Sequence, residues 1–196
     1  MYYLAEKLKD KKVILASASP RRKELLGGLG IPFTIGKVTD YNETYPKDLD
    51  VKRVPQYICR QKSLHFSRPL KENEIVITAD TIVVLDGKKI GKPKDRTDAV
   101  KMLRKLSAHK HTVVTGVCIR DCKHQKSFSA TSDVWFGEIN NDEINWYVDN
   151  YKPYDKAGSY GVQEWIGYIG ILKINGSFYN VMGLPIQKLY RELLKF

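Results

Sequence analysis

The chain has 196 residues, of which 42% are hydrophobic and 11% aromatic, a composition that fits an ordinary globular protein with one sizeable core. Its formal net charge of +11 favours acidic partners, which include nucleic acid, an anionic membrane and a small phosphorylated metabolite. The lysines are scattered along the chain, so a solvated basic surface is the alternative interpretation. We expect a single domain over residues 1–196.

The cysteines and the apolar segments exclude several classes of protein. Cys59, Cys118 and Cys122 form no even disulfide framework, and the N-terminal segment lacks the apolar centre of a signal peptide. The longest apolar run is interrupted by Asp80 and is too short to span a membrane. The spacing of the cysteines and histidines matches no common zinc finger or ribbon. We therefore expect a reduced, cytoplasmic protein without a membrane partner.

The predicted elements alternate between strands and helices. In chain order they are a strand at 11–17, a helix at 20–30, a strand at 32–38, a helix at 54–66, a strand at 74–87, a helix at 96–106, strands at 111–121 and 126–139, a helix at 141–150, a strand at 168–176 and a helix at 184–196. Asp86-Gly87 is a hairpin signal within this series. The order predicts an α/β domain around a mixed central sheet with flanking helices and no internal repeats.

The first informative segment is SASPRRKELL, at residues 17–26. Ser19 suits the N-cap of a helix and Pro20 suits its first position. Arg21, Arg22 and Lys23 then occupy the first turn, where the positive end of the helix dipole disfavours cations. An anion bound at this helix start would compensate for that arrangement.

The second informative segment is TADTIVVLDGKKIGKPK, in which Asp80 interrupts an apolar strand. A buried carboxylate is costly unless it is paired, hydrogen-bonded or bound to a metal. A two-residue turn at Asp86-Gly87 would set Thr81 opposite Lys92 and so bring Lys92 beside Asp80. A bulge or the end of the strand pairing would then let the side chains of Lys92 and Asp80 meet. A structural Asp–Lys pair and a functional site both fit these residues.

The third informative segment is YDKAGSYGVQ, at residues 154–163, where Gly158 and Gly161 interrupt a polar and aromatic stretch. Most loops with glycines are only connections, although loops commonly carry function. Lys156 adds a cation, and Gln163 offers a donor and an acceptor that would complement the imide edge of a pyrimidine base.

These three segments resemble, in order, the motifs of the Maf proteins, nucleoside triphosphate pyrophosphatases also described as septum-formation inhibitors. SASPRR resembles the N-terminal signature, ADTIV with GKPKD the central block, and DKAGSYGVQ the C-terminal loop. Asn42-Glu43 stands where the family usually shows Asp-Glu, and Lys62 lies where it has a lysine in the second helix. The resemblance implies the Maf and inosine-triphosphatase-like fold, with a cleft between two lobes, and a homodimer.

The resemblance also implies a reaction, in which a nucleoside triphosphate is hydrolysed between its α and β phosphates to a monophosphate and pyrophosphate. Asp80, Glu43 and Lys92 are the implied catalytic residues. Glu43 and Asp80 would hold Mg²⁺ or Mn²⁺, and Asp80, or a water bound through it, would activate the attacking water. Which carboxylate is the base and which is only a ligand stays open. The implied substrate-binding residues are Ser17, Arg21, Arg22, Lys62, Thr81, Lys92 and Gln163.

Two positions bear on the substrate within the family. Arg21 and Gln163 resemble the branch that acts on dTTP and UTP, with CTP or modified pyrimidine nucleotides as further candidates, whereas the 7-methyl-GTP branch shows Trp and Glu at those places. The 7-methyl-GTP activity is therefore one alternative. The other is a basic module that binds nucleic acid or a division protein without turnover, but the chain has no known recognition helix or aromatic RNA-binding signature, so we expect no stable nucleic-acid partner.

Overall fold

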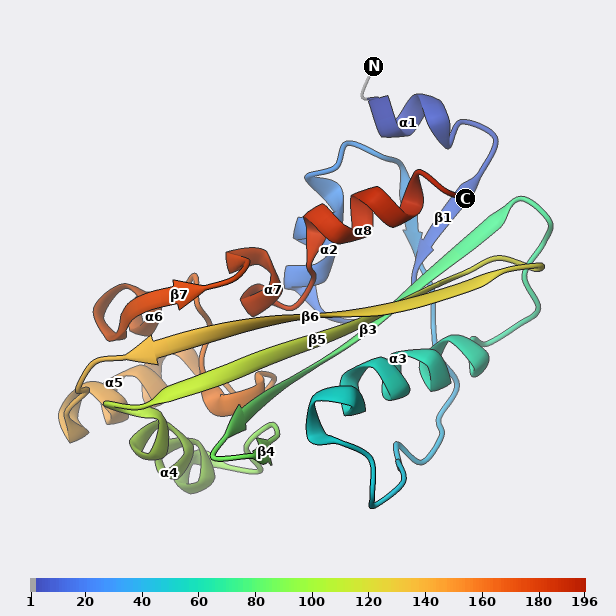
Figure 1. The fold of residues 1–196 in the computed structure, drawn as a ribbon. Helices are drawn as coiled ribbons and strands as arrows, with labels where there is room; N and C mark the ends of the chain where they lie inside the picture. The colour runs from blue at the N-terminus through green and yellow to red at the C-terminus, as the bar shows by residue number, and fades with distance from the viewer. Residues whose placement is uncertain (1–2) are drawn as a thin grey trace. The chain divides into compact units, whose positions relative to one another are not determined.

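The computed structural model describes residues 3–196 and shows helices arranged around one mixed sheet (Figure 1). The elements in chain order are α1 (Tyr3–Lys7), β1 (Lys12–Leu15), α2 (Pro20–Gly27), β2 (Phe33–Ile35), η1 (Val51–Arg53), α3 (Val54–Leu64), β3 (Glu74–Leu85), β4 (Lys88–Ile90), α4 (Arg96–Leu106), β5 (Lys110–Arg120), β6 (Gln125–Phe136), α5 (Asn141–Tyr151), η2 (Ala157–Ser159), α6 (Trp165–Gly170), β7 (Ile171–Asn175), α7 (Phe178–Met182) and α8 (Ile186–Leu193).

The sheet has seven strands in the order β2-β1-β3-β5-β6-β7, and β4 pairs with β3 outside this path. β1 lies parallel to both β2 and β3, whereas β3 with β4 and β6 with β7 form antiparallel pairs. The prediction of an α/β fold around a mixed central sheet is therefore confirmed. None of the helices among the described residues combines the length and the apolar character that a membrane span needs.

The chain divides into two compact units, which we describe separately. Unit 1 contains the residues up to Asp80 together with Thr115–Ala130 and Gly183–Phe196, and unit 2 contains Thr81–Val114 and Thr131–Met182. The long strands β3, β5 and β6 each contribute residues to both units.

In unit 1, helix α3 packs closely on the sheet. A Cβ on Gly116 would lie 2.3 Å from the carbonyl carbon of Pro55, so only glycine lets the start of α3 approach β5 this closely. Arg120, at the end of β5, donates from Nε to Ser63 Oγ at 2.9 Å and thereby holds the other end of the helix. These contacts hold both ends of α3 against β5.

In unit 2, the helices α4 and α5 are well capped and joined to each other. Asp95 caps α4 by accepting from the amide of Asp98, and Asn140 forms a capping box with Glu143 at the start of α5. Arg96 of α4 binds Asp149 of α5 with an Nε–Oδ1 distance of 2.6 Å. The apolar faces of both helices are buried, as their periodicity predicts.

The hairpin prediction is confirmed at its turn. Asp86 and Gly87 both have positive φ, as a two-residue hairpin turn requires, and Leu85 pairs with Lys88. The β3–β4 ladder ends at the pair of Val83 with Ile90, before the counted pair of Thr81 with Lys92.

The predicted strand at 168–176 is wrong in its first three residues. Residues 165–170 form helix α6, and only Ile171–Asn175 extend as β7. A short apolar run does not distinguish a strand from a buried helix turn, because its tertiary contacts decide between them. The short helices α1 and α7 also lie outside the predicted elements.

Candidate functional site

The start of α2 has the cap that its sequence predicts. Ser19 is the N-cap and its Oγ accepts from the amide of Arg22 at 3.5 Å, with Pro20 at the first helical position. The Oγ of Ser17 accepts from the amide of Ser19 at 3.3 Å. Both serine hydroxyls are therefore ordered at the positive end of a helix, where an anion would bind.

The side chain of Arg22 is bound inside unit 1. Its Nε donates to Gly183 O and its Nη1 to Ala79 O, both at 2.9 Å, and Nη1 also lies 3.4 Å from Ser17 Oγ. Burial lowers the pKa of Arg22, the charge of Asp80 opposes that effect, and the neighbouring Arg21 adds to it. The positive charge of Arg22, which lies at the positive end of the helix dipole, is thus compensated by backbone carbonyls. Arg22 also connects Ser17 with Ala79, the residue before Asp80.

Lys62, Asp80 and Glu43 come together in unit 1. The Nζ of Lys62 lies 2.8 Å from Asp80 Oδ1 and 3.2 Å from Glu43 Oε1. The register of α3 on β3 explains this meeting, because Thr78 Oγ1 donates to Cys59 O at 2.6 Å. Asp80 follows Thr78 on the same face of the strand, and Lys62 follows Cys59 by about one helical turn. We call these three residues the Lys62 cluster.

Tyr41 belongs to the surroundings of the Lys62 cluster, although the sequence analysis did not identify it. Burial raises its pKa, and the charges of Glu43 and Asp80 raise it further. Its ring stacks on His65 with a centroid distance of 4.4 Å. In the sequence, only the closeness of Tyr41 to Glu43 indicates that Tyr41 lies beside the Lys62 cluster.

The Lys62 cluster fits a hard divalent cation in its donor chemistry. Its two carboxylates lie within bonding distance of one ammonium, and among residues 3–196 Lys62 is their only hydrogen-bonding or ion-pair partner. Mg²⁺ and Mn²⁺ prefer oxygen ligands, and Mg²⁺ takes one or two carboxylates together with water and substrate phosphates. No group of three or more His, Cys, Asp or Glu side chains in the described chain could hold a metal by itself.

Thr81 and Lys92 lie in unit 2. Asp80 and Thr81 are the only interior positions of β3 that are not buried, and Lys92 is an exposed residue that follows the end of β4. Gly91, the residue before Lys92, accepts at its carbonyl from the amide of Gly158 at 3.0 Å. Gly158 has a φ of +73°, which favours glycine. The segment of Lys92 is therefore attached to the loop 154–163.

Gln163, at the end of this loop, has a polar atom without a partner. Its Oε1 is buried, and no hydrogen-bond donor reaches it among the described residues. It lies at a pocket of about 210 Å³ whose other lining residues are Val162, Gly167, Tyr168, Ile171, Ile174 and Phe178. The residue that the sequence singled out as a base contact thus presents an unsatisfied acceptor beside apolar and aromatic side chains.

A buried network holds the loop that ends at Gln163. Tyr147 of α5 accepts from the amide of Gly161 at 3.1 Å and donates to Glu164 Oε2. The Nζ of Lys156 lies 3.1 Å from Glu164 Oε1 and 2.8 Å from Asp155 Oδ1. The sequence analysis missed Tyr147 and Glu164, because only tertiary folding brings α5 to the loop.

The structure therefore brings the expected site residues into two groups. In unit 1, Ser17 lies with Arg22, and Lys62 joins Glu43 and Asp80. Thr81, Lys92 and Gln163 belong to unit 2. Arg21 lies half-buried in the first turn of α2 in unit 1.

Several bacterial proteins are similar to this chain. A protein named dTTP/UTP pyrophosphatase from Bacteroides thetaiotaomicron is 56% identical over 94% of this chain and 95% of its own. Proteins of the same name from Parabacteroides distasonis and Flavobacterium psychrophilum are 51% and 44% identical, over 98% and 97% of this chain and 100% and 97% of their own.

One solved structure, a nucleoside-triphosphatase or dITP/XTP pyrophosphatase from Mycobacterium abscessus, aligns with a TM-score of 0.40 and 13% identity over 65% of this chain and 75% of its own. The model of the family described as Maf-like protein matches residues 12–196. Because that match covers nearly the whole chain and includes all three motifs, the chain belongs to the Maf family.

Proposed function

We propose that this protein is a nucleoside triphosphate pyrophosphatase that hydrolyses dTTP and UTP to the monophosphate and pyrophosphate. The observation that carries the proposal is the Lys62 cluster, in which two carboxylates with free oxygen atoms meet one ammonium. The substrate is supported by the name dTTP/UTP pyrophosphatase that relatives at 44–56% identity share. CTP and modified pyrimidine nucleotides are further candidate substrates.

Hydrolysis at phosphorus asks the protein mainly to position the reactants and to neutralise charge on oxygen. We assign Asp80 to hold the attacking water and accept its proton, because it is mostly buried and oriented by Lys62. Lys62 and Lys92 bind phosphate oxygens and offset their charge. Ser17, Arg21, Arg22 and the amides at the start of α2 bind the remaining phosphate oxygens, in the place where the helix dipole favours an anion.

Nucleotide pyrophosphatases of this family generally use a divalent metal. We propose Mg²⁺ or Mn²⁺, held by Asp80 and Glu43, whose carboxylates keep oxygen atoms that no group of residues 3–196 binds. When bound, such a cation neutralises charge on phosphate oxygens and polarises the phosphoryl group. Glu43 lies in a loop and is more exposed than Asp80, so we assign it to metal binding alone.

We further propose that Gln163 recognises the base. A neutral carboxamide complements the imide edge of uracil or thymine, whereas a carboxylate would suit the cationic base of 7-methyl-GTP. The buried and unpartnered Oε1 supports this role, because it would accept a hydrogen bond from the base. We also assign Thr81, which follows Asp80 in the chain, to substrate binding.

The organisation of the protein is also proposed. We infer that residues 1–196 work as one Maf-like domain, which is supported by the family match to residues 12–196. A cytoplasmic location is supported by the three cysteines, all of which are free. A homodimer is supported by the family resemblance alone.

The test is pyrophosphate release from dTTP, UTP, CTP, GTP and 7-methyl-GTP, each with Mg²⁺ and with Mn²⁺. We expect metal-dependent turnover of dTTP and UTP that Asp80→Asn abolishes. Asp10→Asn, at an exposed position that makes no hydrogen bond or ion pair through its side chain among residues 3–196, is the matched control and should retain full activity. Turnover of 7-methyl-GTP alone would contradict the substrate, and the absence of any turnover would instead favour a binding protein.

A further inference from the structure

Glu43 lies on a part of unit 1 that has little structure of its own. Residues 39–46 form no helix or strand, the side chain of Glu43 is 53% exposed, and among residues 3–196 Lys62 is the only group that binds it. Holding such a segment in one conformation costs conformational entropy, and a partly exposed ion pair offsets only a small part of that cost. Another contact must therefore hold the segment of Glu43.

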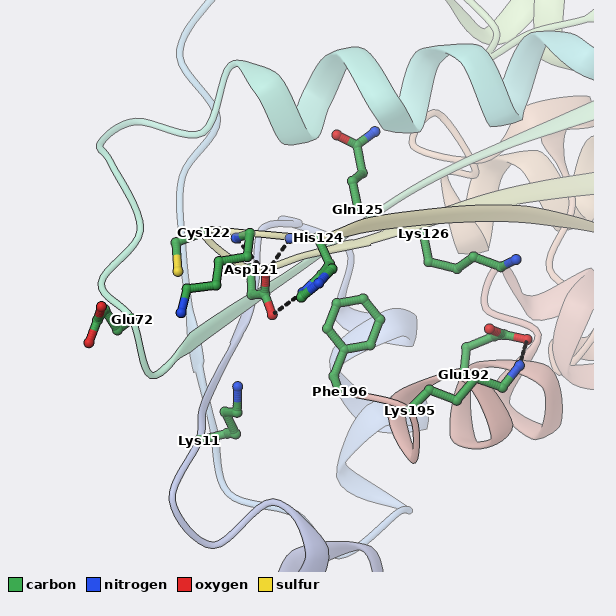
Figure 2. A pocket seen from close by; sticks show the side chains of 11 residues that line it. Lys11, Glu72, Asp121, Cys122, His124, Gln125, Lys126, Glu192, Lys195 and Phe196 are labelled. Carbon is green, nitrogen blue, oxygen red and sulfur yellow. Dashed lines mark hydrogen bonds and ion pairs between the residues drawn. The ribbon is translucent and has the colours of Figure 1, made fainter.

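Another carboxylate of unit 1 is held by its own turn (Figure 2). Asp121, between β5 and β6, accepts at Oδ1 from the amides of Lys123 and His124 at 2.7 and 2.6 Å. Local hydrogen bonds of this kind fix a carboxylate without help from distant residues. No backbone amide of residues 3–196 binds the side chain of Glu43, so its position depends on contacts that its neighbours make.

The segment before Glu43 is attached to the end of α3. Thr39 donates to the carbonyl of His65 from its amide and from its Oγ1, at 2.8 and 2.9 Å. Tyr41 then stacks its ring on the ring of His65, with 4.4 Å between the centroids and 13° between the planes. The His65 ring is itself held, because its Nδ1 lies 2.9 Å from Gln61 O. The stack therefore anchors the segment two residues before Glu43.

The stack and the ion pair of Glu43 have matching spacings. Lys62 and His65 are three residues apart at the end of α3, where such side chains lie about 5–6 Å from each other. Tyr41 and Glu43 are two residues apart, and two residues of extended chain span about 6.6 Å with both side chains on one side. The segment thus contacts the last turn of α3 at two successive points, Tyr41 on His65 and Glu43 on Lys62.

The ring of Tyr41 makes this contact, whereas its hydroxyl adds little. The hydroxyl lies 3.5 Å from Ile58 O, at the outer limit of a hydrogen bond. Stacked rings are stabilised by the area that they bury and by their offset geometry. Phenylalanine at position 41 would therefore keep the contact with His65, and alanine would remove it.

We propose that Tyr41 is a positioning residue for the metal site: its stack on His65 holds Glu43 beside Asp80, so that the two carboxylates are already close when a divalent cation binds. The inference rests on the proposed assignment of Glu43 and Asp80 to metal binding. Residues that orient metal ligands change metal affinity about 10–100-fold when they are removed. Tyr41 acts in this way through Glu43 and is not a ligand itself.

The test is Mn²⁺ binding to the nucleotide-free, full-length protein, followed by the electron paramagnetic resonance signal of free Mn²⁺. Tyr41→Ala and His65→Ala should each weaken binding roughly tenfold, and Tyr41→Phe should stay within about twofold of the wild type. In the background of Glu43→Gln, Tyr41→Ala should have almost no further effect, because both residues act on one interaction. A general loss of structure would instead weaken binding in both backgrounds.

Turnover of UTP gives a second readout. The Mg²⁺ concentration for half-maximal turnover should rise about tenfold in Tyr41→Ala, while kcat at saturating Mg²⁺ changes less than about threefold. The matched control is Tyr3→Ala, which removes an exposed tyrosine of the same unit. It should change neither Mn²⁺ binding nor the Mg²⁺ requirement.

The outcomes separate this inference from the proposed function. If Glu43→Gln weakens Mn²⁺ binding and Tyr41→Ala does not, the inference is overturned and the metal assignment stands. The inference is also overturned if Tyr41→Ala weakens binding equally in the wild type and in Glu43→Gln. If the wild type binds no Mn²⁺, or if Glu43→Gln leaves the binding unchanged, the metal assignment fails and the inference fails with it.

Discussion

The two units contain lysine clusters of the same composition that are completed in different ways. In unit 1, Lys62 binds Asp80 and Glu43, and the side chains of these three residues are 18%, 17% and 53% exposed. In unit 2, Lys156 binds Glu164 and Asp155, and the corresponding values are 9%, 19% and 53%. Charge and burial therefore do not distinguish the two clusters.

The difference lies in the remaining carboxylate oxygens. In unit 2, Glu164 Oε2 accepts from Tyr147, whose hydroxyl in turn receives the amide of Gly161. In unit 1, the second oxygen of Asp80 has no hydrogen-bond partner in the described chain. A fully bonded network rigidifies a loop, whereas an ion pair with free acceptors can still receive water, a metal or a substrate.

The largest expected effect is on turnover and separates an aspartate of each cluster. Asp80→Asn should lower kcat for UTP by about 10³-fold or more, because it removes the proposed base while preserving shape. Asp155→Asn should lower kcat by less than about threefold. Steady-state pyrophosphate release from both variants measures these changes in kcat. Equal losses of kcat would contradict a catalytic role for the unit 1 cluster alone.

The second expected effect is on stability, and here the cluster of unit 2 should be the more sensitive of the two. Glu164→Gln should lower the free energy of unfolding by about 2 kcal/mol, because it removes one of the two acids that compensate the buried Lys156. All three tryptophans, Trp135, Trp146 and Trp165, belong to unit 2, so their fluorescence during urea unfolding reports this loss. Glu43→Gln should leave the same curve unchanged within error. A larger loss in Glu43→Gln would show that the unit 1 cluster is the structural one.

The third expected effect is on pH dependence in unit 2. Burial lowers the pKa of His111 to about 4 from its ordinary 6.5, and its Nε2 lies 2.7 Å from the hydroxyl of Tyr160. Between pH 6.5 and 4 the unfolded chain binds a proton that the folded protein does not, so stability is present above pH 6.5 and falls as the pH drops through this window.

Tryptophan-monitored urea unfolding measures that slope directly. His111→Phe should flatten the slope between pH 6.5 and 4 by close to one proton. Arg68 lowers the pKa of Glu74 in unit 1 to about 2 from 4.5, so that pair loses its contribution only below about pH 4.5. Arg68→Met should therefore change the slope mainly below about pH 4.5 and much less than His111→Phe above about pH 5. An unchanged slope in His111→Phe would contradict the assignment.

The smallest expected effect concerns the position of Gln163. Tyr147→Phe removes the hydroxyl that joins Glu164 to the amide of Gly161, and should raise KM for UTP about threefold while kcat changes less than twofold. The matched control, Tyr179→Phe, alters an exposed tyrosine of the same unit. A fall in kcat at constant KM would contradict a positioning role.

Local patterns in the sequence predicted the features that neighbouring residues decide. Ser19 and Pro20 specify the start of α2 through a side-chain cap and a preset φ. Asp86 and Gly87 specify the hairpin because both adopt positive φ. The family motifs directed attention to Lys62, Asp80 and Glu43, which the structure then brought together.

Contacts between distant segments could not be predicted in this way. Nothing in the sequence indicated that the guanidinium of Arg22 donates to the carbonyls of Ala79 and Gly183. Residues 168–170 were predicted as the start of a strand, yet they belong to α6. In each case the deciding partner lies on another element, where local periodicity carries no information.

The sequence by itself determined the α/β class, the capped start of α2, the β3–β4 turn and the family, because each depends on backbone preferences or on motifs of adjacent residues. Only the tertiary structure decided that Lys62 pairs with Asp80 and that Tyr147 completes the bonding of Glu164. The physical reason is that hydrogen bonds and ion pairs act over a few ångströms of space, whatever the separation along the chain.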